Sequence, residues 1–239
     1  MAPEIRLWRR MLPAQTDAEF FAAVKSLKRF ISVFLGLMLF CAAMAYLESA
    51  VVVYLRALYS PDGSDLMLNR IPPQIIHIEI FREAATIIML AAVSILAGHS
   101  RRQRTGAFIF CFGIWDIFYY IWLKILINWP AGLMDRDILF LIPTIWVGPV
   151  LAPVLISVGL VVTGIVLFIR TVSERPVRNR WLSWILIPGG CGLMIESFLV
   201  QNPHTFEELA QIRYPWELFI LGMVVVVGGL GVMLFPESK

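Results

Sequence analysis

Six long apolar stretches dominate the hydropathy pattern of this chain, and short polar segments separate them. About 20 apolar residues are needed for a helix to cross a bilayer. A transmembrane barrel would instead show alternating segments of about ten residues. The pattern therefore predicts an all-α polytopic membrane protein, a bundle of six transmembrane helices. The predicted spans are residues 30–59, 74–98, 106–129, 146–169, 181–200 and 214–235.

A basic leader, residues 1–29, precedes the first span, and a short tail, residues 236–239, follows the last one. Thr16 and Glu19 have the spacing of a capping box, and apolar residues follow at roughly helical intervals. We expect residues 17–29 to form an interfacial helix on the cytoplasmic surface. The same charges fit equally well a solvated leader that only sets topology. The remainder, residues 30–235, is expected to be one transmembrane domain.

Proline and glycine are expected to break the fourth and fifth spans. Pro143, Pro149 and Pro153 lie in the long apolar region before Ile169. Because proline lacks a backbone donor, we expect these residues to divide the region into a short re-entrant or interfacial piece and a kinked span. In the fifth span, residues 188–190 form a Pro-Gly-Gly sequence that predicts a second break.

Loop charges predict the orientation. The chain is 59% hydrophobic and 15% charged, so its few charged residues are informative. Arg and Lys gather in the leader and in the connections 99–105 and 170–180, while the other connections lean acidic. Since basic loops stay in the cytoplasm, both termini are expected there. We expect the membrane to be a bacterial inner (plasma) membrane. The small net charge of +3 gives no indication of nucleic-acid binding.

The second span begins with an unusual polar segment. His77, Glu79, Arg82 and Glu83 all lie within its first ten residues. Ionisable groups inside a membrane cost several kcal/mol unless they pair or line a wet cavity, so they indicate a functional site. Glu79 and Glu83 are four residues apart and share a helix face, and Arg82 is close enough to pair with Glu79.

The other intramembrane acids are expected at a similar depth. At about 1.5 Å per residue, Glu48, Glu83 and Asp116 would lie roughly 15 Å below the outer surface. A shallower set, within roughly 8 Å of that surface, consists of His77, Glu79, Glu196 and Glu217. The inner half of the spans contains almost no ionisable residue. This asymmetry predicts a cavity that opens to the outer leaflet or the periplasm.

Aromatic residues fall in the same half of the spans. Trp115 and Tyr119 are too deep for the aromatic belt of a membrane protein, so we expect them to line the cavity or to belong to the core. Trp146 and Trp216 fit either the belt or the site. Cys41, Cys111 and Cys191 lie inside apolar spans, where we expect free, buried packing residues.

A cavity rich in carboxylates is typical of hydrolysis. Two carboxyl groups in different environments can divide the roles of acid and base, and glycoside hydrolysis needs no metal or cofactor besides such a pair. The sequence therefore favours an intramembrane hydrolase, a glycosidase that acts on a glycolipid head group without a cofactor. The expected catalytic residues are Glu48, Glu79 and Glu83. The expected substrate-binding residues are His77, Arg82, Trp115, Asp116, Tyr119, Trp146, Glu196 and Trp216.

Within this hypothesis the drier carboxyl, Glu48 or Glu83, would be the acid, and Glu79 the nucleophile or base. Other interpretations stay open. The carboxylates could relay protons in a transporter or channel-like protein, although the chain shows no internal repeat. They could also form a structural ion-pair network or a metal centre. The glycine-rich sixth span would suit a structural subunit of a membrane complex.

Overall fold

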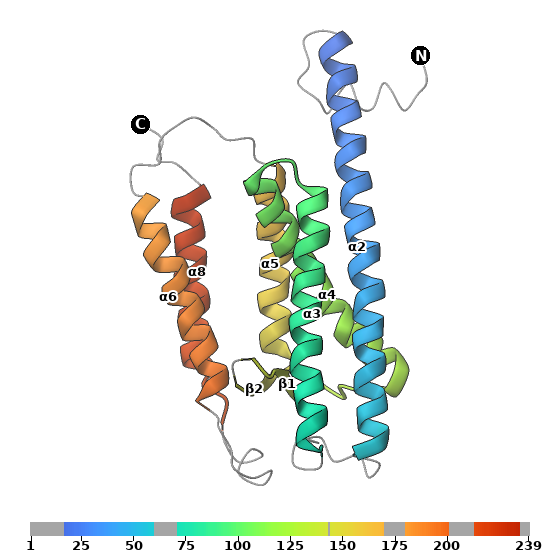
Figure 1. Cartoon of the computed structure of the whole chain (residues 1–239). Coiled ribbons are helices and arrows are strands. Elements are labelled where there is room, and N and C mark those ends of the chain that lie inside the picture. Colours follow the sequence, from blue (N-terminus) through green and yellow to red (C-terminus); the bar gives the residue numbers. More distant parts are fainter. Residues whose placement is uncertain (1–16, 60–70, 143, 170–179, 201–212, 235–239) are drawn as a thin grey trace.

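The computed structural model describes residues 17–59, 71–142, 144–169, 180–200 and 213–234. Within these ranges it contains six helices long and apolar enough to cross a membrane, which confirms the predicted helical bundle and fits an integral membrane protein. The helices run alternately up and down (Figure 1). They are α2 (Asp17–Tyr59), α3 (Pro73–Ala97), α4 (Arg101–Ile127), α5 (Leu151–Ile169), α6 (Arg180–Leu199) and α8 (Trp216–Leu234).

Local sequence signals set the ends of the central helices. Pro73 occupies the first turn of α3, where a proline has no helical hydrogen bond to lose. Ser100 caps the start of α4, and its side chain accepts a hydrogen bond from the backbone N–H of Gln103. At the other end of α4, Asn128 adopts the left-handed conformation with φ of 54°, which ends the helix. These ends lie within a few residues of the predicted ones.

Two groups of helices make up the bundle. Helices α2, α3, α4 and α5 pack together, while α6 pairs with α8, and this pair contacts the rest at residues 146–149 and at the start of α5. Glycines allow the close crossings. A Cβ atom on Gly106 of α4 would lie 2.8 Å from the carbonyl oxygen of Gly164 on α5, and one on Gly190 of α6 would lie 2.6 Å from that of Gly222 on α8. The sixth span thus admits a close neighbour, as its glycine content predicts.

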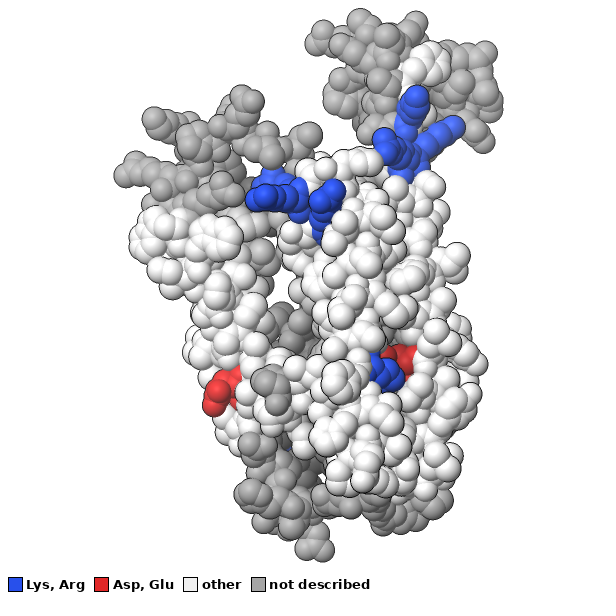
Figure 2. Space-filling view, in the orientation of Figure 1, with Lys and Arg blue, Asp and Glu red and all other residues white. Residues whose placement is uncertain are grey.

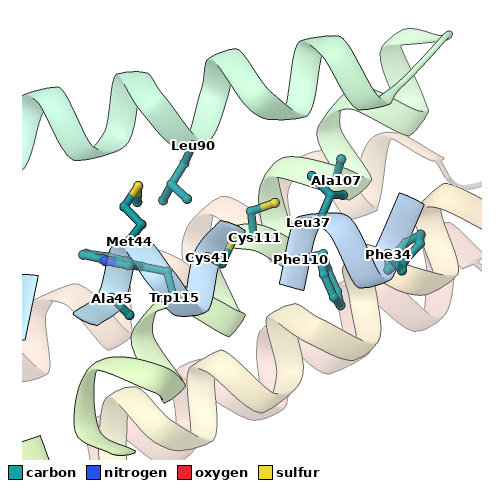
Figure 3. Close-up of a cluster of buried hydrophobic side chains, with 10 residues drawn as sticks. All are labelled: Phe34, Leu37, Cys41, Met44, Ala45, Leu90, Ala107, Phe110, Cys111 and Trp115. Atoms are coloured by element: carbon teal, nitrogen blue, oxygen red, sulfur yellow. The ribbon is translucent and has the colours of Figure 1, made fainter. Parts of the chain in front are cut away.

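Buried side chains of α2, α3 and α4 form the largest apolar cluster (Figure 3). Cys41 and Cys111 are fully buried in it as free thiols, as predicted, whereas Cys191 is only half-buried. Polar contacts add to the packing of α2 on α4. The indole N–H of Trp122 donates to the carbonyl of Ala42 at 2.8 Å.

A β-hairpin replaces the expected re-entrant piece. Strand β1 (Arg136–Phe140) pairs with β2 (Trp146–Pro149) in antiparallel fashion, with Ile138 opposite Val147. Because β2 extends to Pro149, the fourth span begins at Leu151 and not near Trp146. The expected break inside this span was wrong. Pro153 lies in the first turn of α5, where the missing N–H costs no hydrogen bond.

Two other expected features differ from the structure. Residues 17–29 are helical, but they are the first turns of a continuous α2 and not a separate interfacial helix. The Pro-Gly-Gly sequence of the fifth span lies inside a continuous α6, with Pro188 within the helix. In the first place two expected segments form one helix, and in the second the helix continues through residues that were expected to interrupt it. The remaining parts of the leader and the tail, residues 1–16 and 236–239, lie outside the described residues.

The two ends of the bundle differ in character. The hairpin end comprises the end of α2, the start of α3, the end of α4, the hairpin and the start of α5 (Figure 1). Lys and Arg gather at the opposite end, which we call the basic end (Figure 2). There Arg29 of α2 and His99, just after α3, contact each other through a side-chain hydrogen bond.

Candidate functional site

A cavity of about 110 Å³ lies inside the hairpin end, between α2, α3, α4 and β1. We call it the polar cavity because ionisable side chains from four elements line it. Together these carry five carboxylates and two guanidinium groups. The polar or aromatic lining residues are Glu48, Arg56, Glu79, Arg82, Glu83, Trp115, Asp116, Tyr119, Tyr120 and Asp137.

Arg82 is the centre of an ion-pair network. Its Nε lies 2.7 Å from Oε2 of Glu79, one turn earlier on α3, as the spacing predicts. A second ion pair joins its Nη1 to Oε1 of Glu48 on α2. Thr86 donates to the carbonyl of Arg82 at 3.1 Å and lies 3.4 Å from Glu48. Both carboxylates of this network therefore share one guanidinium.

Glu83 has a different partner. The backbone N–H of Leu141, just after β1, lies 3.0 and 3.2 Å from its two carboxylate oxygens. Within the described part of the chain, no ion pair to Glu83 is formed. The hairpin thus supplies the hydrogen bond that holds this carboxylate, and no cation among the described residues forms an ion pair with it.

Asp116 is held by a serine of the neighbouring helix. Oγ of Ser157 on α5 donates to Oδ2 of Asp116 at 2.7 Å. Gly113, one turn before Asp116, makes this contact possible. A Cβ atom there would lie 2.6 Å from the carbonyl oxygen of Ser157, so any side chain would push the two helices apart. Asp116 also forms no ion pair among the described residues.

Asp137 of β1 and Arg56 of α2 form a longer ion pair in the lining of the polar cavity. Nη2 of Arg56 is 4.0 Å from Oδ1 of Asp137, and its guanidinium lies 3.9 Å from the ring centroid of Trp129. Burial raises the pKa of the Asp137 carboxyl to about 7, although the Arg56 charge acts in the opposite direction. Oδ2 of Asp137 and Nε of Arg56 are buried without a hydrogen-bond partner in the protein.

A second, larger cavity adjoins the polar one. It has a volume of about 340 Å³ and lies between α3, α4, α5, α6 and the hairpin. We call it the apolar pocket because aromatic and aliphatic side chains line most of it. Glu83, Asp116 and Leu139 line both cavities, and Ser157 lines the apolar pocket beside Asp116. The two unpaired carboxylates therefore lie where a polar space meets an apolar one.

The structure brings together most of the predicted site residues. Seven of them line the polar cavity: Glu48, Glu79, Arg82, Glu83, Trp115, Asp116 and Tyr119. Trp146 lines the apolar pocket instead. The shared depth inferred from the sequence therefore corresponds to a real convergence of α2, α3 and α4.

Three predicted residues lie elsewhere. His77 is exposed. It precedes Glu79 by two residues, and this spacing is a rotation of about 200° around a helix, so its side chain points away from the cavity. Glu196 is exposed on α6. Trp216 packs into a second apolar cluster, with its ring centroid 4.8 Å from that of Tyr214. The hairpin lies between the α6–α8 pair and the polar cavity. Depth along the membrane normal therefore did not show which residues reach the cavity.

Sequence reasoning missed Arg56, Tyr120 and Asp137 as cavity residues. Asp137 was assigned to an acidic connection, but the strand β1 turns its side chain inward and buries it. A usable signal was present. Arg56 lies at the end of an apolar span. Because a cation there is costly unless it is paired, it predicts a carboxylate at the same end of the bundle.

Among the described residues, no group of three or more His, Cys, Asp or Glu side chains is arranged to hold a metal ion. The polar side chains that line the two cavities include five carboxylates, two guanidinium groups, the phenols of Tyr119 and Tyr120, and the hydroxyl of Ser157. Comparisons with protein-family models, with curated proteins and with solved structures find no match to this chain. The residues of the site are thus the basis for assigning a function.

Proposed function

We propose that this protein is an intramembrane hydrolase that cleaves the head group of a membrane lipid, and that the bond broken is glycosidic. The observation that carries this proposal is the position of Glu83 and Asp116. Both line the polar cavity and the apolar pocket, and neither has a basic partner among the described residues. A lipid with its head in one space and its chain in the other presents its linking bond to this pair.

The structure changes which carboxylates we assign to the chemistry. Glu48 and Glu79 both pair with Arg82, so their negative charge is already engaged. We assign them to hold the guanidinium, which can then bind a head-group oxygen. Glu83 stays in the catalytic set, and Asp116 joins it. Glu83 and Asp116 come from different helices and have different hydrogen-bond donors, an arrangement that suits two separate roles.

The reaction needs only this pair and water. One carboxyl group protonates the oxygen of the leaving lipid alcohol. The other carboxylate either attacks the anomeric carbon, for later hydrolysis of the glycosyl ester, or removes a proton from the attacking water. The products are a free sugar and a lipid alcohol. A separation of about 5 Å between the two groups would favour retention of configuration, and a wider one inversion.

The proposal includes an orientation. Basic residues mark the end of the bundle opposite the hairpin, and positive loops stay in the cytoplasm. The hairpin end would then face the outer leaflet of a bacterial inner membrane, with both termini cytoplasmic. Labelling with an impermeant thiol reagent tests this orientation. A cysteine placed at Met134 should react from outside and one at Arg102 should not. The reverse pattern would overturn the orientation.

The activity is tested with purified protein and a panel of glycolipids and phospholipids. Release of free sugar from a glycolipid supports the proposal, and the variants described in the Discussion locate the pair. Release of diacylglycerol or a phosphorylated head group from phospholipids alone would contradict a glycosidase. Proton flux in proteoliposomes without turnover of any lipid would replace hydrolysis with transport. That alternative is weakened by the basic end, none of whose described residues lines the polar cavity.

A further inference from the structure

The apolar pocket lies at the depth of the hydrocarbon core. Ile87 on its wall is about 21 Å along α3 from Pro73, which places it well inside the span. Phe112 of α4 and Ile156 of α5 line the pocket from other helices. Its volume of about 340 Å³ is within the roughly 300–1,000 Å³ range of ligand pockets. A pocket with these walls at this depth is suited to a hydrocarbon chain and not to a water-soluble solute.

Access to the pocket comes from the side of the bundle. Phe198 of α6 forms one wall, and among the described residues the α6–α8 pair contacts the rest of the protein at β2 and at the start of α5. Away from β2, the surface is hollowed between the α6–α8 pair and the other helices, as Figure 2 shows. Ile142 at the tip of the hairpin, also a lining residue, is 39% exposed. A lipid chain can therefore enter laterally from the membrane without crossing the ion-pair network.

The polar end of the pocket determines which head groups fit. Glu83 and Asp116 can only accept hydrogen bonds when ionised, so they favour donors such as hydroxyl or amine groups. The adjoining cavity holds five carboxylates and two guanidinium groups, and each guanidinium already faces a carboxylate. A phosphate group would therefore meet an excess of negative charge.

We propose that the apolar pocket binds one hydrocarbon chain of a lipid whose head group carries hydroxyl or amine donors and no phosphate, with that head group in the polar cavity beside Glu83 and Asp116. This inference names the substrate class of the proposed hydrolase, and rests on that function only for the statement that the bound lipid is cleaved. Binding itself is independent of turnover. The two can thus be tested separately.

The test uses the full chain in nanodiscs and two photoreactive probes with the same diazirine-bearing alkyl chain. One probe carries an S-linked glucose, which resists hydrolysis, and the other carries phosphocholine. We expect the glucoside to label residues of the apolar pocket, mapped by mass spectrometry, at least tenfold more strongly than the phosphocholine probe. Equal labelling by both probes, or labelling confined to residues outside the pocket, would overturn the proposal.

A pocket-filling variant provides the specific control. Ile156→Trp should reduce labelling by the glucoside about tenfold, whereas Val158→Trp should not, because Val158 on the same helix is 51% exposed and faces away. If Ile156→Trp lowers the folded yield, Ile142→Trp at the rim is used in its place. Unchanged labelling in a folded pocket variant refutes the site. Labelling that depends on the pocket, in a protein that cleaves no lipid, supports the binding site and rejects the hydrolase.

Discussion

The backbone N–H of Leu141 lies within hydrogen-bonding distance of both carboxylate oxygens of Glu83, at 3.0 and 3.2 Å. This contact joins the residue after β1 to the last residue of the polar segment of α3. A hydrogen bond to a charged group contributes about 1.5–3 kcal/mol, so the hairpin is a substantial part of what positions this carboxylate.

Removing that donor should impair turnover. Leu141→Pro deletes the N–H, and we expect kcat to fall by about 10- to 100-fold, which is the range that corresponds to the hydrogen bond. Leu141→Ala keeps the donor and should retain most of the activity. The measurement is kcat for the two variants, and thermal unfolding checks that both are folded. Equal losses would mean that the side chain of Leu141 matters and its N–H does not.

The two carboxylates assigned to the reaction should each be indispensable. We expect Glu83→Gln and Asp116→Asn to lower kcat by about 10²- to 10⁴-fold, the usual contribution of a positioned acid or base. Glu196→Gln is the matched control, because this carboxylate is exposed on α6 and lines neither cavity. Full activity in the Asp116→Asn variant would mean that Asp116 is not catalytic, and the catalytic pair would then be sought among the glutamates of α2 and α3.

Arg82 should matter for stability as well as for binding. Arg82→Met leaves Glu48 and Glu79 close together without their cation, and we expect a loss of about 3–5 kcal/mol in the free energy of unfolding. The triple variant that adds Glu48→Gln and Glu79→Gln removes both unpaired charges and should recover much of that loss. Arg213→Met disrupts only an exposed pair with Glu217 and should have little effect.

Unfolding of each variant in a denaturing detergent, at constant lipid content, measures these differences. A mild effect of Arg82→Met, similar to that of Arg213→Met, would show that the two glutamates do not depend on the guanidinium.

Asp137 should make stability depend on pH. Burial raises its pKa in the folded state to about 7, above its value of about 3.9 in an unfolded chain. The folded state thus binds more protons between these values, so stability should fall as pH rises from about 4 to about 7 and then level off. Asp137→Asn should remove this part of the slope. Asp135→Asn, in the neighbouring turn, should keep it.

The measurement is the free energy of unfolding at pH 5 and pH 8 for the three proteins. A wild-type protein and an Asp137→Asn variant with the same pH dependence would contradict a raised pKa at this position.

Gly113 should be required for the contact between α4 and α5. Gly113→Ala places a Cβ atom 2.6 Å from a backbone oxygen, and we expect such overpacking to cost about 1–3 kcal/mol. It should also separate Ser157 from Asp116 and lower turnover. Gly159→Ala on α5 is the control, since nothing lies within 4 Å of a Cβ atom there. Equal tolerance of both changes would refute this role for Gly113.

Features that depend on one helix at a time could be predicted from the sequence. The apolar spans follow from the length that a bilayer requires, and α3 and α4 begin and end near residues with strong terminal signals. The pair between Glu79 and Arg82 follows from a spacing of three residues on one helix. Depth along the membrane normal is likewise a local count of residues, and it correctly grouped Glu48, Glu83 and Asp116.

Features that depend on how helices face one another were decided only by the tertiary structure. Depth does not specify the direction in which a side chain points, so His77 and Glu196 were placed in the site although both are exposed. The same limit hid Glu48 as the second partner of Arg82. The hairpin was hidden for another reason. Its two strands are only five and four residues long, and such short runs do not distinguish a strand from a buried helical segment. Its pairing turns Asp137 inward and brings the N–H of Leu141 to Glu83, which completes the polar cavity.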